Sequence, residues 1–136
     1  MMRQFFLGLI FTGLFIAGCA QDPVPAQEGP FVGDAAAGQR IYIFCQSCHS
    51  INEGGSNKVG PNLYGIFGQQ AAAAEGFTYS DALSSSNIVW TADMLDQWIT
   101  RPAALVPGTT MVFAGVNNPQ QRADLIAYLQ TAGGTP

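Results

Sequence analysis

The sequence has few of the residues on which many kinds of binding site depend. Its 136 residues include one histidine, three cysteines and a single lysine, Lys58, and they show no convincing strand pattern. One histidine excludes any site within a single chain that needs two imidazoles. The formal net charge of −4 argues against nucleic-acid binding and against electrostatic attraction to anionic lipid. The length suits one domain better than two.

The N-terminal residues 1–18, MMRQFFLGLIFTGLFIAG, form an uncharged apolar run after one early basic residue, Arg3. The run is short for a membrane span and has the layout of a secretory signal peptide, although an uncleaved anchor helix is an alternative. Ile16-Ala17-Gly18-Cys19 at its end resembles the lipobox of bacterial lipoproteins, where the cysteine is lipidated and becomes the mature N-terminus.

We therefore predict three segments: a lipoprotein-type signal peptide over 1–18, a proline-rich tether over 19–32 and one domain over 33–136. Cys19 is the predicted lipid anchor. Without Arg3, 4 of the 5 basic side chains remain against 9 acidic ones, which gives a net charge of −5.

The domain is predicted to be all-α, with about three main helices and long loops. Each helix has a capping residue before an apolar period. The expected helices and their N-caps are 35–44 after Asp34, 92–101 after Thr91 and 119–132 after Asn118.

Residues 50–89 are rich in Gly, Ser, Asn and Ala and are expected to be loop with short turns. Structureless loops of this length are uncommon in a compact domain. The loops nevertheless contain aromatic residues, which disordered segments rarely have. A large, rigid, apolar cofactor would organise them.

Cys45, Cys48 and His49 form a Cys-x-x-Cys-His motif. Zinc generally needs a second ligand pair, and no such pair is present. A thioredoxin-like couple belongs near a βαβ unit, which the pattern lacks. A disulfide would leave His49 and the aromatic loops unexplained. Attachment of one covalent haem c through two thioethers, with His49 ligating iron, accounts for the whole motif and agrees with export.

A six-coordinate iron also needs a second axial ligand, and no second histidine exists. Met94 lies in an expected helix beside Leu95 and Ile99, where core packing explains it. Met111 follows the Pro/Gly-led stretch 107–110, whose loop can bring a thioether to the open face. We predict Met111 as the ligand.

From residue 33 onward the chain resembles a class I cytochrome c, of the branch that contains mitochondrial and purple-bacterial carriers. The matching pieces occur in the family's order and cover nearly the whole domain. They are GDAAAGQRIY, CQSCH, VGPNLYGIFG, EGFTYSDA, Trp90, PGTTMVFAG and RADLIAYL.

The resemblance implies further roles. The carbonyl of Pro61 would accept a hydrogen bond from His49. Tyr79, Trp90 and Thr109 would hold the haem propionates. Near the ends of the domain, Gly38 and Tyr42 would pack against the C-terminal helix at Leu125 and Tyr128.

The sequence also departs from the family pattern. Three positions near the haem of relatives differ here: arginine, asparagine and tyrosine are replaced by Gln69, Leu83 and Trp98. The resemblance therefore does not predict the exact redox potential. Lysines of the mitochondrial branch are replaced here by Ala103, Ala104 and Thr110. The resemblance therefore does not predict the docking surface.

We expect a monomeric one-electron carrier, not an enzyme, tethered by lipid on the periplasmic side of a membrane. Its expected partners are redox proteins: a quinol-oxidising cytochrome complex, a terminal oxidase, a reaction centre or a dehydrogenase. Three alternatives are a haem-based gas sensor, a peroxidase and a fixed subunit of a larger complex. The sensor would need a weak or absent Met111, and a peroxidase usually needs distal acid–base residues.

Overall fold

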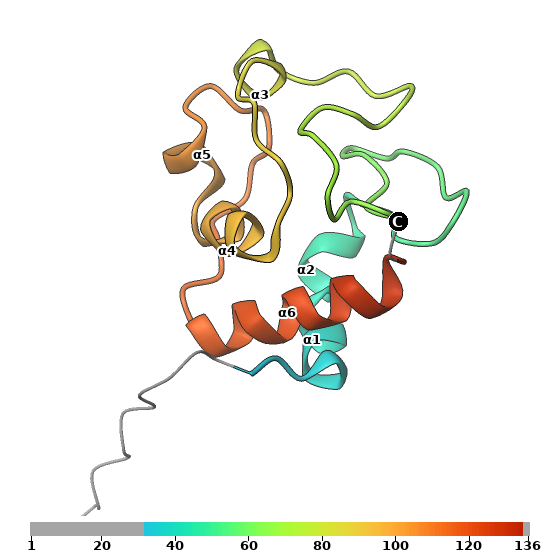
Figure 1. Cartoon of the computed structure of the whole chain (residues 1–136), viewed down its shortest axis with the longest axis vertical. Coiled ribbons are helices and arrows are strands. Elements are labelled where there is room, and N and C mark those ends of the chain that lie inside the picture. Colours follow the sequence, from blue (N-terminus) through green and yellow to red (C-terminus); the bar gives the residue numbers. More distant parts are fainter. Residues whose placement is uncertain (1–31, 135–136) are drawn as a thin grey trace, which may run out of the picture.

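The computed structural model describes residues 32–134, which contain six helices (Figure 1). Cys19 and the predicted tether up to residue 31 lie outside this range. The described residues contain no strand, only an isolated antiparallel bridge between Gln70 and Val89. None of the helices within 32–134 is long and apolar enough to cross a membrane. The helix bounds are α1 Ala35–Ile41, α2 Ile43–Gln46, α3 Asp81–Ser84, α4 Ala92–Thr100, α5 Pro102–Leu105 and α6 Pro119–Ala132.

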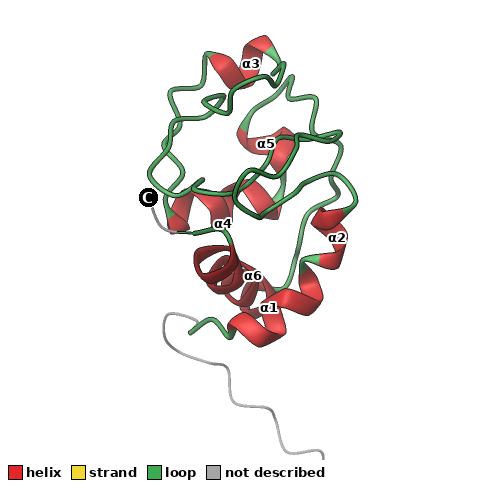
Figure 2. Cartoon of the chain, turned by 90° about the vertical axis from the view of Figure 1, so that its right-hand side faces the viewer, coloured by secondary structure: helices red, strands yellow, loops and turns green. Residues whose placement is uncertain are grey.

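The first and last helices cross and pack together at one end of the molecule (Figure 2). A Cβ atom at Gly38 would collide with the carbonyl of Asp124, so only glycine permits this approach. The rings of Tyr42 and Tyr128 lie 5.3 Å apart, and Leu125 is fully buried beside them. The predicted packing of α1 on α6 is thus confirmed.

The three predicted N-caps are confirmed. The side chain of Asp34 accepts from the N–H of Ala36 at 2.8 Å, and Thr91 and Asn118 cap α4 and α6 in the same way. Each cap satisfies an N–H group that has no partner within its helix. The first helix differs from the prediction, because it is interrupted at Tyr42 and resumes as α2.

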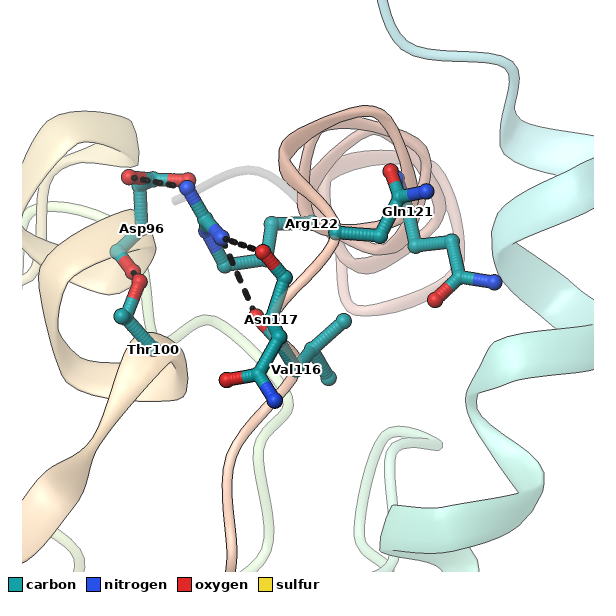
Figure 3. A network of polar contacts seen from close by, with 7 residues as sticks. Asp96, Thr100, Val116, Asn117, Gln121 and Arg122 are labelled. Carbon is teal, nitrogen blue, oxygen red and sulfur yellow. Dashed lines mark hydrogen bonds and ion pairs between the residues drawn. The ribbon is translucent and has the colours of Figure 1, made fainter.

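The fourth helix ends at Thr100, because the next residue, Arg101, has an extended backbone. This is the conformation that a residue before proline favours, and Pro102 follows. Pro102 then begins the short helix α5. An ion pair of 2.7 Å between Asp96 and Arg122 joins α4 to α6 (Figure 3). The same guanidinium donates to the carbonyls of Val116 and Asn117, which fixes the loop that enters α6.

The long loop between α2 and α4 contains one helical turn, α3, and is otherwise irregular, as predicted (Figure 2). Its two arms are joined by backbone bonds from Gly68 to Trp90 and from Ala71 to Ile88. The buried core lies mainly on α4 and α6. The loops are therefore left to enclose a space beside the core.

Candidate functional site

That space is a cavity of about 580 Å³, a size typical of sites for small molecules and cofactors. Its walls come from α2, the long loop, α4 and the loop after α5. All eight residues predicted to contact the cofactor line it: Cys45, Cys48, His49, Pro61, Tyr79, Trp90, Thr109 and Met111. The structure thus brings together positions spread over 67 residues of sequence.

Cys45 and Cys48 lie at the end of α2 and are half-buried free thiols. Burial raises the pKa of Cys45 to about 11, and the neighbouring Cys48 contributes a smaller part of this rise. This thiol is therefore protonated at neutral pH, unlike the thiolate of a dithiol redox couple. No group of three or more His, Cys, Asp or Glu side chains within 32–134 is arranged to hold a metal ion, which also disfavours the zinc interpretation.

His49 is oriented by its neighbours in the 58–61 segment. Its Nδ1 lies 2.7 Å from the carbonyl oxygen of Pro61, which can only accept, so Nδ1 carries the proton and Nε2 is left with its lone pair. Burial lowers the pKa of His49, and the positive charge of Lys58 lowers it further. The hydrogen bond to Pro61 raises this pKa and offsets part of the change. A neutral imidazole with a free Nε2 is the form that binds a metal.

Two residues of this segment were given no role from the sequence. A Cβ atom at Gly60 would collide with the His49 ring. The ammonium of Lys58 donates to the carbonyl of Gln46 at 2.7 Å and to that of His49 at 3.3 Å. The only available signal was the Gly-Pro pair that follows the motif, which indicates a turn but not what it contacts.

Met111 lies half-buried in the loop that follows α5 and lines the same cavity as His49. Its backbone N–H donates to the hydroxyl of Thr109 at 3.3 Å, which fixes the loop next to the thioether. Met94 does not line the cavity and packs against the core from α4. The contrast agrees with the assignment of Met111 as ligand and Met94 as core.

Aromatic side chains form much of the rest of the wall. The rings of Trp90 and Trp98 meet edge to face with centroids 5.3 Å apart, and both residues are buried. Tyr79 packs on Phe77 with centroids 4.8 Å apart, and burial raises the pKa of Tyr79. At the rim, by contrast, Phe44, Val59 and Val112 are 67%, 79% and 102% exposed.

The residues present fit a haem attached through cysteines. Two thiols and a histidine at the end of one short helix, a methionine on a separate loop and apolar aromatic walls share one cavity. A thioether and an imidazole are the axial pair of many electron-transfer haems. The site and the helical fold together define a c-type cytochrome.

A sequence model of the cytochrome c family matches residues 35–133, and the chain belongs to this family. The chain is similar to cytochrome c2 of Blastochloris viridis, with 45% identity over 122 residues that cover 90% of this chain and 91% of that protein. It is 50% identical to cytochrome c of Trypanosoma brucei brucei over 99 residues, which cover 73% and 91% of the two chains.

Among solved structures, cytochrome cH from Methylobacterium extorquens matches with a TM-score of 0.69 and 44% identity, covering 73% of this chain and 99% of that one. The protein therefore has the class I cytochrome c fold that was predicted. It binds one covalent haem c through a Cys-x-x-Cys-His motif and is a monohaem electron carrier, not an enzyme.

Proposed function

We propose that Cys45 and Cys48 form the two thioether bonds to the haem, and that His49 and Met111 are its axial ligands. The observation that carries this proposal is the placement of Met111 and His49 on one cavity, with Met94 outside it. The bound haem iron supplies one-electron chemistry by alternating between its ferric and ferrous states. The protein's own part is to hold the two ligands and to exclude water.

The surrounding side chains have supporting roles in this proposal. Pro61 fixes the His49 ring and holds the proton on Nδ1, which leaves Nε2 free to bind iron. Tyr79, Trp90 and Thr109 line the cavity and hold the propionates through a phenol, an indole N–H and a hydroxyl. Apolar walls keep the dielectric constant low, and together with methionine ligation this raises the reduction potential.

We further propose that the carrier works on the periplasmic side of a membrane, tethered through a lipid on Cys19. This part is supported by the lipobox-like Ile16-Ala17-Gly18-Cys19 and by the proline-rich residues up to 32, all of them sequence features. Its partners would be redox proteins: a quinol-oxidising cytochrome complex on one side and a terminal oxidase, a reaction centre or a dehydrogenase on the other.

An absorption spectrum of the purified protein with and without carbon monoxide tests the ligation. We expect the spectrum of a six-coordinate haem c that carbon monoxide does not change. Ready binding of carbon monoxide by the ferrous protein would mean an open distal position and would favour the gas-sensor alternative. Co-purification of a stoichiometric partner after detergent extraction would favour the fixed-subunit alternative.

A further inference from the structure

Lys58, the only lysine in the chain, directs its ammonium group at the backbone of the Cys-x-x-Cys-His segment. Nζ donates to the carbonyl oxygens of Gln46 and His49, at 2.7 and 3.3 Å. Two of its three N–H donors are thus engaged by the residues that frame Cys48. Lys58 itself is exposed, and both bonds lie at the surface of the domain.

The two carbonyls differ in the other partners that they have. Gln46 is the last residue of α2, where carbonyls have no partner within the helix. The carbonyl of His49 also accepts from the hydroxyl of Tyr42 at 3.1 Å. The backbone of the proposed iron ligand is therefore held by two donors from different segments.

Backbone hydrogen bonds of residues 58–60 also hold the Cys-x-x-Cys-His segment in place. The N–H of Gly60 donates to the carbonyl of Cys48 at 2.8 Å, and the N–H of Lys58 donates to the carbonyl of Gly60 at 2.8 Å. With the bond between His49 and Pro61, residues 58–61 hold the carbonyls of Gln46, Cys48 and His49 and the His49 ring. Lys58 supplies the only charge in this set of contacts.

The charge itself has a redox consequence. Lys58 does not itself line the cavity, but its ammonium contacts the backbone of His49, which does. Oxidation adds one positive charge at the iron, and a nearby fixed cation opposes it. The chain has few other cations that could act in the same direction, since it has more acidic than basic side chains.

We propose that Lys58 is a positioning residue that holds the haem-binding segment and raises the reduction potential. The inference rests on the proposed role of His49 as an iron ligand.

The test uses purified full-length holoprotein carrying Lys58→Met, Lys58→Arg, Lys58→Gln or Arg40→Met. Arg40 is the matched control, since it is exposed and donates to the carbonyl of Ala36 within its own helix. We expect Lys58→Met to lower the reduction potential and the midpoint of thermal unfolding. Lys58→Arg should restore most of both, and Arg40→Met should change the potential much less. Added salt should reduce the potential difference but not the stability difference.

Lys58→Gln separates charge from hydrogen bonding and replaces Lys58→Met if that variant yields little holoprotein. It should keep part of the stability and lose the potential shift conferred by the cation. A potential equal to that of the parent protein in Lys58→Met or Lys58→Gln overturns the proposal. So does a variant whose only defect is slower, salt-dependent electron transfer to a redox partner. The absorption spectrum of the parent protein shows whether the iron is six-coordinate and so tests the proposed ligation separately.

Discussion

Gly60 lies against the imidazole of His49 so closely that a Cβ atom would collide with the ring. The next residue, Pro61, receives the Nδ1 hydrogen bond at 2.7 Å. One dipeptide therefore sets both the position and the tautomer of the proposed proximal ligand. A side chain at residue 60 cannot be added without moving one of these contacts.

We expect Gly60→Ala to displace the ring or the loop, because both are fixed by hydrogen bonds. The cost should be about 1–3 kcal/mol of unfolding free energy, as in other overpacked sites. The measurement is thermal or denaturant unfolding of the holoprotein, together with its reduction potential. Ser56→Ala, an exposed change in the same loop, is the control and should alter stability by less than about 0.5 kcal/mol. Equal effects of the two substitutions would contradict the steric argument.

Substitution of the two methionines separates ligation from packing. Met111→Ala should open the distal position, lower the reduction potential and let the ferrous protein bind carbon monoxide. Met94→Ala should leave the spectrum unchanged and reduce stability, toward the lower end of about 2–5 kcal/mol because Met94 is half-buried. If the two phenotypes were exchanged, the axial assignment would be wrong.

Removal of the thioether cysteines tests whether the cofactor organises the loops. A cavity of about 580 Å³ beside a core made mainly by α4 and α6 leaves much of the domain without internal packing. We predict that the double variant Cys45→Ala, Cys48→Ala is mostly unfolded by circular dichroism. A cooperative thermal transition in that haem-free protein would refute this prediction.

The lipid anchor is tested by Cys19→Ser. We expect the variant to release the mature domain from membranes or to retain an uncleaved leader, with normal haem attachment. Mass spectrometry of the mature N-terminus of the parent protein should find a lipidated Cys19. An unmodified N-terminal residue other than Cys19 would contradict the proposed tether.

The exposed rim of the cavity indicates how partners bind. Phe44, Val59 and Val112 are apolar and exposed there, and Ala103 and Ala104 are exposed on α5. We predict docking to an apolar surface of a redox partner through Val112 and its neighbours, with Ala103, Ala104 and Phe113 included. Electron transfer should then change little between low and physiological salt, because steering by charge is weak and a tether supplies effective concentration.

Val112→Glu should slow that electron transfer without altering the spectrum. The control is Val32→Glu, the same change at an exposed valine that does not line the cavity, and it should have little effect. Rates that fell severalfold over the salt range would instead reveal a charged docking surface.

Local signals in the sequence were sufficient for the starts of α1, α4 and α6 and for the cofactor. Asp34, Thr91 and Asn118 cap helices because their side chains bond to N–H groups two or three residues away. The Cys-x-x-Cys-His motif is equally local. The expected first helix, 35–44, was wrong in one respect, the break at Tyr42. Tyr42 bonds to the carbonyl of His49 and packs on Tyr128, contacts that no local pattern encodes.

The roles of Lys58 and Gly60 could not be read from the sequence for the same reason. Both residues contact atoms about ten positions earlier in the chain, across an irregular loop. Such a loop has no hydrophobic periodicity from which these contacts could be predicted. The turn that precedes Met111 was recognisable from Pro107 and Gly108, because proline and glycine fix backbone geometry by themselves. Packing of loop on loop is instead expected to depend on the cofactor.

The pairing of α1 with α6 also sets the order of events when the chain is made. The N–H of Asp34 donates to the carboxylate of Asp124, a contact between residues 90 positions apart. Contacts of such long sequence separation form only when both partners exist, and closing so long a loop is slow. Synthesis therefore delivers the Cys45–His49 segment well before the helix that completes the domain. During that interval the two thiols are open to covalent modification, before the domain is complete.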